Sequence, residues 1–94
     1  MMTQEEIRGR LQVLPKWVYE NNLLQRSVAT SDFASALALV NKIGEEAERQ
    51  NHHPDITLSY GKVGITLTTH DAGGVTEKDF VLAKTIEGLV DHLS

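Results

Sequence analysis

Apolar residues recur at helical spacing in three segments of the chain, and shorter runs of apolar residues lie between them. The three segments run from residue 3 to 15, from residue 30 or 31 to 51 or 52, and from residue 76 to 93. In the middle segment the apolar positions follow the i, i+3, i+4, i+7 rule of a helix with one buried face. These positions are Phe33, Ala36, Leu37, Val40, Ile43, Gly44 and Ala47. The pattern therefore predicts three helices.

Residue types favoured at helix ends mark the limits of the second and third helices. Thr30 or Ser31 can cap the second helix, and Pro54 prevents it from continuing. Thr76 can cap the third helix, with Asp79 three residues later in an arrangement that resembles a capping box. We therefore expect the Thr76 region to be the start of a helix rather than a loop.

Two pairs of shorter apolar segments predict two hairpins. Residues 17–28 contain apolar runs on either side of the polar turn Glu20-Asn21-Asn22. The second pair is Ile56 to Tyr60 and Val63 to Thr68, with Gly61-Lys62 as the expected turn. The order helix, two strands, helix, two strands, helix predicts a single α+β domain over residues 1–94. Its expected architecture is a four-stranded antiparallel sheet with three helices packed on one face. The open face of such a sheet favours pairing with a second copy, so we expect a dimer.

The composition excludes several classes of function. The chain has nine basic and thirteen acidic residues, a formal net charge of −4 and no basic stripe, so we expect no direct binding to nucleic acid. The absence of cysteine excludes disulfides, cysteine nucleophiles and thiolate zinc sites. The longest apolar run, residues 36–40, is far too short for a membrane helix. We expect an unprocessed, soluble, cytoplasmic protein without membrane contact.

Three of the four histidines lie where the second predicted hairpin would bring its outer ends together. His52 and His53 precede the first strand of that hairpin, and His70 follows the second strand with Asp71 beside it. Glu48 lies four residues before His52, one helical turn away, and could orient its imidazole. Imidazoles clustered with carboxylates suit proton transfer near neutral pH. The spacing predicts an acid–base site at this corner.

Other interpretations of the same residues stay open on spacing alone. Three histidines with Asp71 or Glu48 could bind zinc or iron, although adjacent His52 and His53 project in different directions and no short metal motif is present. On the simplest interpretation Asp79 caps its helix and has no other role, and His92 is a surface residue near a helix C-terminus. No P-loop, dinucleotide-binding or serine-nucleophile motif is found.

The histidine cluster belongs to a longer pattern that resembles the signature of the pterin-4a-carbinolamine dehydratases. The pattern consists of Glu48, His52-His53-Pro54, Tyr60, His70 and Asp79 with matching spacing at every step. The resemblance extends over nearly the whole chain. It implies an α+β fold with a four-stranded antiparallel sheet, and a homodimer or homotetramer. It also implies dehydration of 4a-hydroxytetrahydropterin to quinonoid dihydropterin, without a metal or a redox cofactor.

The same resemblance implies the site residues. As catalytic residues we expect His52, His53, His70 and Glu48, with His52 as the leading acid/base, Glu48 orienting it, and His53 and His70 holding the pterin and sharing in proton transfer. The expected substrate contacts are His52, His53, Pro54, Thr69, His70, Asp71, Ala72, Trp17 and Lys78. Trp17 either stacks on the pterin ring or belongs to the core.

Two positions depart from the family pattern. Ile56 stands where many relatives have tryptophan, which removes an aromatic wall, and Lys78 stands where relatives often have arginine.

Two other functions are alternatives to the dehydratase activity. One is a non-catalytic dimerisation or regulatory module of the same fold, and the other is a pterin-binding protein acting in molybdopterin metabolism.

Overall fold

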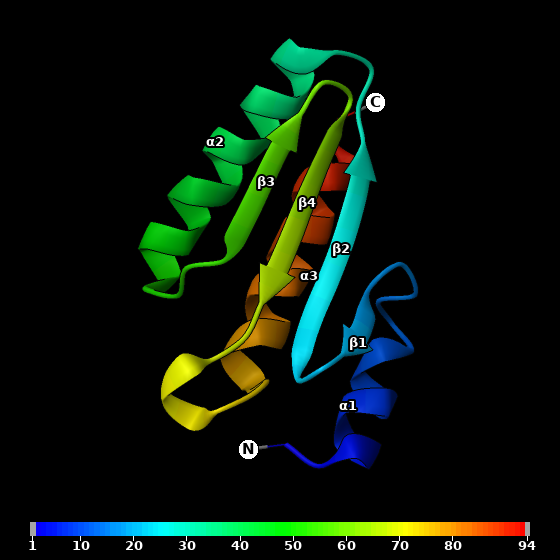
Figure 1. Cartoon of the computed structure of the whole chain (residues 1–94), viewed down its shortest axis with the longest axis vertical. Helices are drawn as coiled ribbons and strands as arrows, with labels where there is room; N and C mark the ends of the chain where they lie inside the picture. Colours follow the sequence, from blue (N-terminus) through cyan, green and yellow to red (C-terminus); the bar gives the residue numbers. More distant parts are fainter. Residues whose placement is uncertain (1, 94) are drawn as a thin grey trace.

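A four-stranded antiparallel sheet with strand order β1-β2-β4-β3 forms one layer of the protein (Figure 1). The computed structural model describes residues 2–93. The strands are β1 (Val18–Glu20), β2 (Leu23–Ala29), β3 (Asp55–Ser59) and β4 (Lys62–Leu67). The helices are α1 (Gln4–Leu11), α2 (Phe33–Gln50) and α3 (Glu77–Asp91), with a 3-10 turn, η1 (His70–Ala72), before α3. The predicted α+β fold and the predicted order of elements are confirmed.

Both hairpins have two-residue turns. Asn21 and Asn22 connect β1 to β2 with φ values of 55° and 64°, which asparagine tolerates better than most residues do. In the second hairpin Ser59 pairs with Lys62, so the turn is Tyr60-Gly61 and not the predicted Gly61-Lys62. Gly61 adopts φ 76°, a left-handed conformation that glycine adopts without strain.

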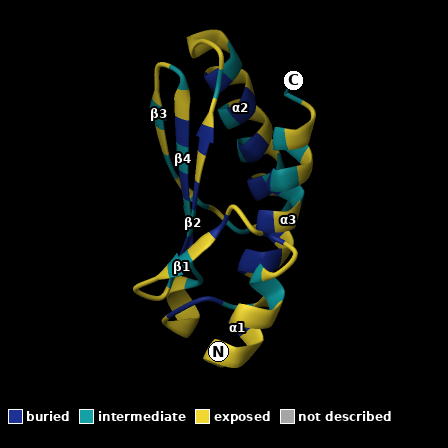
Figure 2. Cartoon of the chain, turned by 90° about the vertical axis from the view of Figure 1, so that its right-hand side faces the viewer, coloured by how far each residue is buried: buried dark blue, intermediate teal, exposed yellow. Residues whose placement is uncertain are grey.

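Helices α2 and α3 cover one face of the sheet (Figure 2). Strand β4 alternates buried Val63, Ile65 and Leu67 with residues on the opposite face, as its sequence predicts. The buried face of α2 is made by Ala36, Leu39, Ile43 and Ala47. The predicted stripe was wrong in part, because Phe33 and Leu37 are exposed at 44% and 41%. Apolar residues occupy more than one side of α2, and only packing against the sheet selects the buried side.

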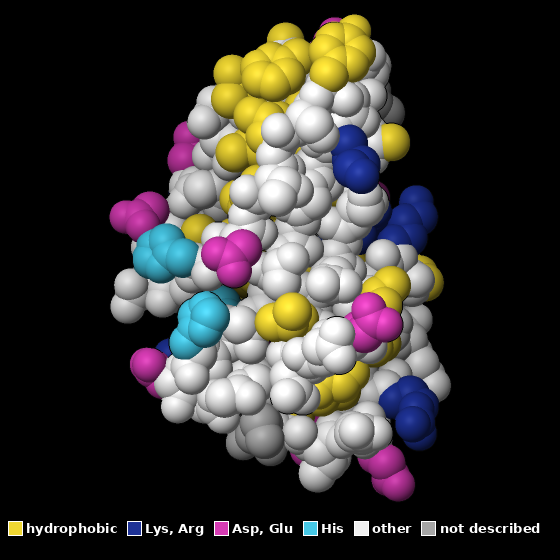
Figure 3. Space-filling view, viewed as in Figure 1, with side chains coloured by type: hydrophobic (Ala, Val, Ile, Leu, Met, Phe, Trp, Pro, Cys, Tyr) yellow, Lys and Arg dark blue, Asp and Glu magenta, His cyan; other side chains and the backbone are white. Residues whose placement is uncertain are grey.

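Hydrophobic side chains gather at the end of the molecule where α2 begins and the β3–β4 turn lies (Figure 3). The exposed residues there are Phe33 and Leu37 on α2 and Tyr60 in the turn. On the open face of the sheet the residues are mostly small or polar, including Ser27, Thr57 and Thr66. Pairing of this face with a second copy stays a prediction.

Helix boundaries differ from the predictions at two places. Helix α1 ends at Leu11, four residues before Pro15, and Leu14 is buried in the connection to β1. Asp32, rather than Thr30 or Ser31, caps α2, because its side chain accepts a hydrogen bond from the backbone N–H of Ser35 at 2.7 Å. Among the described residues no helix has the length and apolar character needed to span a membrane.

Candidate active site

The three histidines meet at the corner where β3 begins and β4 ends. Asp55 pairs with Thr66, so the residues before β3 and those after β4 lie at the same end of the hairpin. A hollow of about 310 Å³ opens there, and all three histidines line it. Its lining residues are Asn51, His52, His53, Thr68, Thr69, His70, Asp71 and Lys78. In the space-filling view histidine and acidic side chains lie together at this indented edge (Figure 3).

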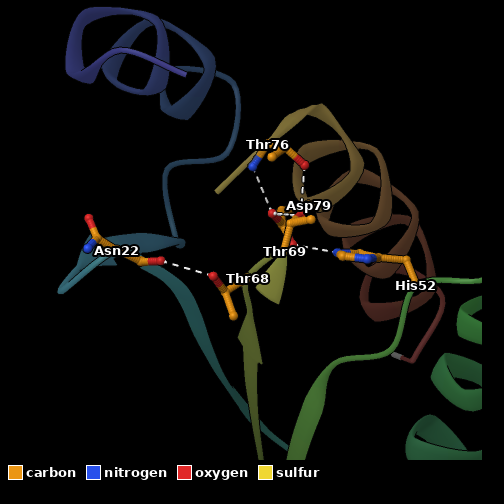
Figure 4. Close-up of polar contacts among 6 residues, drawn as sticks. All are labelled: Asn22, His52, Thr68, Thr69, Thr76 and Asp79. Carbon is orange, nitrogen blue, oxygen red and sulfur yellow. Dashed lines mark hydrogen bonds and ion pairs between the residues drawn. The ribbon is translucent and has the colours of Figure 1, made fainter. Parts of the chain in front are cut away.

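His52 is paired with Asp79 of α3. Its Nε2 lies 2.5 Å from Oδ1 of Asp79 (Figure 4). The His52 side chain is 10% exposed and that of Asp79 is fully buried. This carboxylate was predicted as a helix cap and as part of the signature, but not as a partner of the leading histidine. The only sequence signal was its place in the signature, since 27 residues separate the two.

Asp79 also performs its predicted capping role. Its Oδ2 accepts hydrogen bonds from the backbone N–H of Thr76 at 2.8 Å and from the hydroxyl of Thr69 at 2.7 Å. The hydroxyls of Thr69 and Thr76 are 2.7 Å apart, so they form a chain of hydrogen bonds that ends at the Asp79 carboxylate. Thr69 lines the hollow, but its hydroxyl is hydrogen-bonded within the protein, and a contact with substrate stays a prediction.

Glu48 is hydrogen-bonded to His53 and not to His52. The predicted pairing was wrong because α2 ends earlier than the i, i+4 relationship requires. Asn51 adopts a left-handed conformation with φ 52°, and the backbone N–H groups of Asn51 and His52 donate to the carbonyls of Glu48 and Ala47. This Schellman-type ending turns His52 away from the helix surface, toward α3. The Glu48–His53 pair is solvent-exposed on both sides.

His70 and Asp71 begin the exposed η1 turn and face the hollow from the β4–α3 connection. Lys78, in the first turn of α3, lines this hollow and a second, mainly apolar one beside it. His52 also lines both hollows. The remaining residues that line the second hollow are Gln50, Glu77 and Val81. The Arg10 guanidinium, 2.5 Å from Glu77, lowers the pKa of that carboxyl through their hydrogen bond.

Three predicted substrate contacts lie outside the lining of the histidine hollow. Trp17 is buried in the core, where its Nε1 donates to Oε1 of Glu87 at 2.7 Å, so the core alternative is the one that the structure supports. Pro54 and Ala72 are neighbours of lining residues but do not line the hollow themselves. Ile56 is half-buried on the helix-facing side of the sheet.

No group of three or more His, Cys, Asp and Glu side chains is arranged to hold a metal ion within residues 2–93. The adjacent histidines have separate partners, His52 with Asp79 and His53 with Glu48. The geometry therefore offers imidazoles held by carboxylates, an arrangement suited to proton transfer.

A family model described as pterin 4 alpha carbinolamine dehydratase matches residues 1–89 of the chain. The chain belongs to the pterin-4a-carbinolamine dehydratase family. A relative from Acidobacterium capsulatum is 48% identical over 89 residues, covering 95% of this chain and 97% of the relative. Another from a Nostoc species is 49% identical over 86 residues, covering 92% of each chain. Both are provisionally named pterin-4-alpha-carbinolamine dehydratases.

Two solved structures of dehydratase-like proteins resemble this one. A protein from Brucella melitensis, described as a transcriptional coactivator/pterin dehydratase, superimposes with a TM-score of 0.91 at 30% identity, covering 95% of this chain and 97% of that one. A pterin dehydratase-like protein, described as a RuBisCO assembly factor in the alpha-carboxysome, gives a TM-score of 0.69 at 22% identity, covering 80% and 89%. The second likeness shows a shared fold only.

Proposed function

We propose that this member of the dehydratase family converts 4a-hydroxytetrahydropterin to quinonoid dihydropterin and water. The carbinolamine is the pterin product that an aromatic amino acid hydroxylase leaves behind, so the reaction would support recycling of tetrahydrobiopterin. The observation that carries the proposal is the single hollow lined by His52, His53 and His70. Family membership supplies the substrate class, and the imidazoles supply groups that exchange protons near neutral pH.

The reaction needs two proton transfers and no electrons. The hydroxyl on C4a leaves as water after it is protonated, and the ring nitrogen N5 loses a proton. His52 is the leading acid/base in this proposal because it is nearly buried and has a carboxylate partner. His53 and His70 bind the pterin and share in the proton transfer, and Glu48 orients His53. Lys78 and Asp71 provide polar contacts at the rim.

Stopped-flow absorbance tests the proposal directly. The decay of 4a-hydroxytetrahydrobiopterin is followed with and without protein, since the carbinolamine also dehydrates by itself. We expect acceleration by the wild-type protein and a loss of about 10²- to 10⁴-fold in kcat for His52→Ala and His70→Ala. His92→Ala, on an exposed histidine beyond α3, is the matched control and should keep full activity. A wild-type protein that leaves the decay unchanged refutes the proposal.

A regulatory module of the same fold is the second candidate, because the Brucella melitensis structure carries both a coactivator and a dehydratase description. The same assay separates the two functions. A purely regulatory protein would leave carbinolamine decay at its spontaneous rate.

A further inference from the structure

We infer that Asp79 is a positioning residue that keeps a proton on Nε2 of His52, so that the proton His52 exchanges with a bound ligand is the one at Nδ1. The statement that His52 exchanges a proton with the ligand at Nδ1 rests on the proposed function. The part about the proton on Nε2 rests on the hydrogen bonds of the described residues and on the ionised form of the Asp79 carboxylate.

The two hydrogen bonds that Oδ2 of Asp79 accepts have known donors, and they leave Oδ1 for His52. The backbone N–H of Thr76 can only donate, and it reaches Oδ2 at 2.8 Å. The Thr69 hydroxyl donates to the same oxygen at 2.7 Å and is left to accept from the hydroxyl of Thr76. An ionised carboxylate accepts only, so Oδ1, 2.5 Å from His52, requires a proton on Nε2. Both neutral and protonated His52 satisfy this requirement.

The contact also determines which way the ring faces. A rotation of the imidazole by 180° would place Cε1 where Nε2 lies and would leave Oδ1 of Asp79 without its donor. Nδ1 of His52 makes no hydrogen bond to any other residue in the described part of the chain, residues 2–93. Because His52 lines the histidine hollow while nearly buried, Nδ1 is the nitrogen left for a ligand.

An Asp79→Asn substitution tests this assignment of the hydrogen bonds. Two donors, Thr76 N–H and the Thr69 hydroxyl, converge on Oδ2, so the amide oxygen should take that position. The amide NH₂ group then faces Nε2 of His52, which must become the acceptor. The substitution therefore moves the single proton of neutral His52 from Nε2 to Nδ1. A comparable exchange of carboxylate for amide beside a catalytic histidine of a serine protease preserves geometry but lowers kcat about 10⁴-fold through the wrong tautomer.

The test is a long-range ¹H–¹⁵N correlation spectrum of the ¹⁵N-labelled full chain at about pH 8.5, above the usual titration range of histidine. In wild-type protein we expect His52 to show a protonated Nε2 and a bare Nδ1. In Asp79→Asn we expect the reverse, together with a loss of kcat of about 10²- to 10⁴-fold in the dehydration assay. Asp32→Asn is the matched control, since it makes the same change in another helix-capping aspartate, and it should alter neither the His52 tautomer nor the rate.

Three results would overturn the inference: a bare Nε2 in the wild-type spectrum, an unchanged tautomer in folded Asp79→Asn protein, or a reversed tautomer with wild-type kcat and pH profile. If Asp79→Asn does not fold, the wild-type spectrum decides the tautomer by itself. A wild-type protein with the expected tautomer but no dehydratase activity refutes the proposed function and leaves the role of Asp79 in fixing the proton on His52 intact.

Discussion

Arg26 on β2 and Glu87 on α3 form a largely buried ion pair that joins the sheet to the helix layer. Nε of Arg26 lies 2.5 Å from Oε1 of Glu87, and the two side chains are 7% and 20% exposed. The same carboxylate oxygen accepts from Nε1 of Trp17, and the Arg26 guanidinium also donates to the carbonyl of Ser27. One carboxylate therefore connects β2, α3 and the segment before β1.

Glu87→Ala should lower the free energy of unfolding by about 3 kcal/mol, because it leaves a buried guanidinium and an indole N–H without their acceptor. Urea denaturation monitored by circular dichroism measures the loss. The double variant Arg26→Met/Glu87→Leu should be more stable than Glu87→Ala, because apolar side chains of similar volume often replace a buried ion pair at little cost. If both variants are as stable as wild type, the pair does not contribute to the packing of α3.

Trp17→Phe should affect stability and not substrate binding. The substitution removes the hydrogen bond to Glu87 and part of the core volume, and we expect a loss of about 1–3 kcal/mol in the free energy of unfolding. Because Trp17 does not line the histidine hollow, the KM for the pterin should stay within about twofold of wild type. A large rise in KM with unchanged stability would instead support stacking of Trp17 on the ring.

Glu48→Gln should have a smaller effect on catalysis than Asp79→Asn. The Glu48–His53 pair is exposed to solvent, where ion pairs contribute little, whereas the Asp79–His52 pair is almost fully enclosed. We expect Glu48→Gln to lower kcat/KM by less than about tenfold in the stopped-flow assay. A loss equal to that of Asp79→Asn would show that Glu48 acts on the leading acid/base after all.

The cap of α2 should make part of the stability depend on pH. Hydrogen bonds from Ser35 lower the pKa of Asp32 in the folded protein. A carboxyl with a depressed folded-state pKa stabilises the fold above its unfolded-state pKa, and the effect is lost as pH falls through the folded-state value. The Tm difference between wild type and Asp32→Ala should therefore be largest near about pH 7 and should shrink toward about pH 3. Thermal unfolding of both proteins across this range provides the measurement, and a difference that grows on acidification would contradict the prediction.

The order of elements could be predicted from the sequence because each signal is local. Apolar spacing, the polar turn around Asn21-Asn22 and the Thr76–Asp79 pair act over a few residues, and each marks an element or a turn that the structure contains, although some boundaries differ. The meeting of His52 and His53 with His70 was also predictable, since a hairpin necessarily brings its outer ends together. The predicted turn between β3 and β4 differs from the observed turn by only one residue.

The partners of the side chains at the site could not be predicted in the same way. Glu48 and His52 are one helical turn apart in sequence, but the left-handed Asn51 ends α2 and separates them. Asp79 has the sequence signal of a helix cap, and only the packing of α3 beside the histidine corner brings its second oxygen to His52. The hydrogen bond of the buried Trp17 is likewise made to a distant residue, Glu87, 70 positions away.

The sequence by itself therefore determined the elements, their order and the corner at which the histidines gather. The tertiary structure decided which carboxylate holds which imidazole and which side of α2 is buried. The physical reason is the range of the interactions: capping, turn formation and hairpin pairing are set by neighbours along the chain. Hydrogen bonds between a helix and a distant loop depend instead on how complete layers pack, and many sequence positions contribute jointly to that packing.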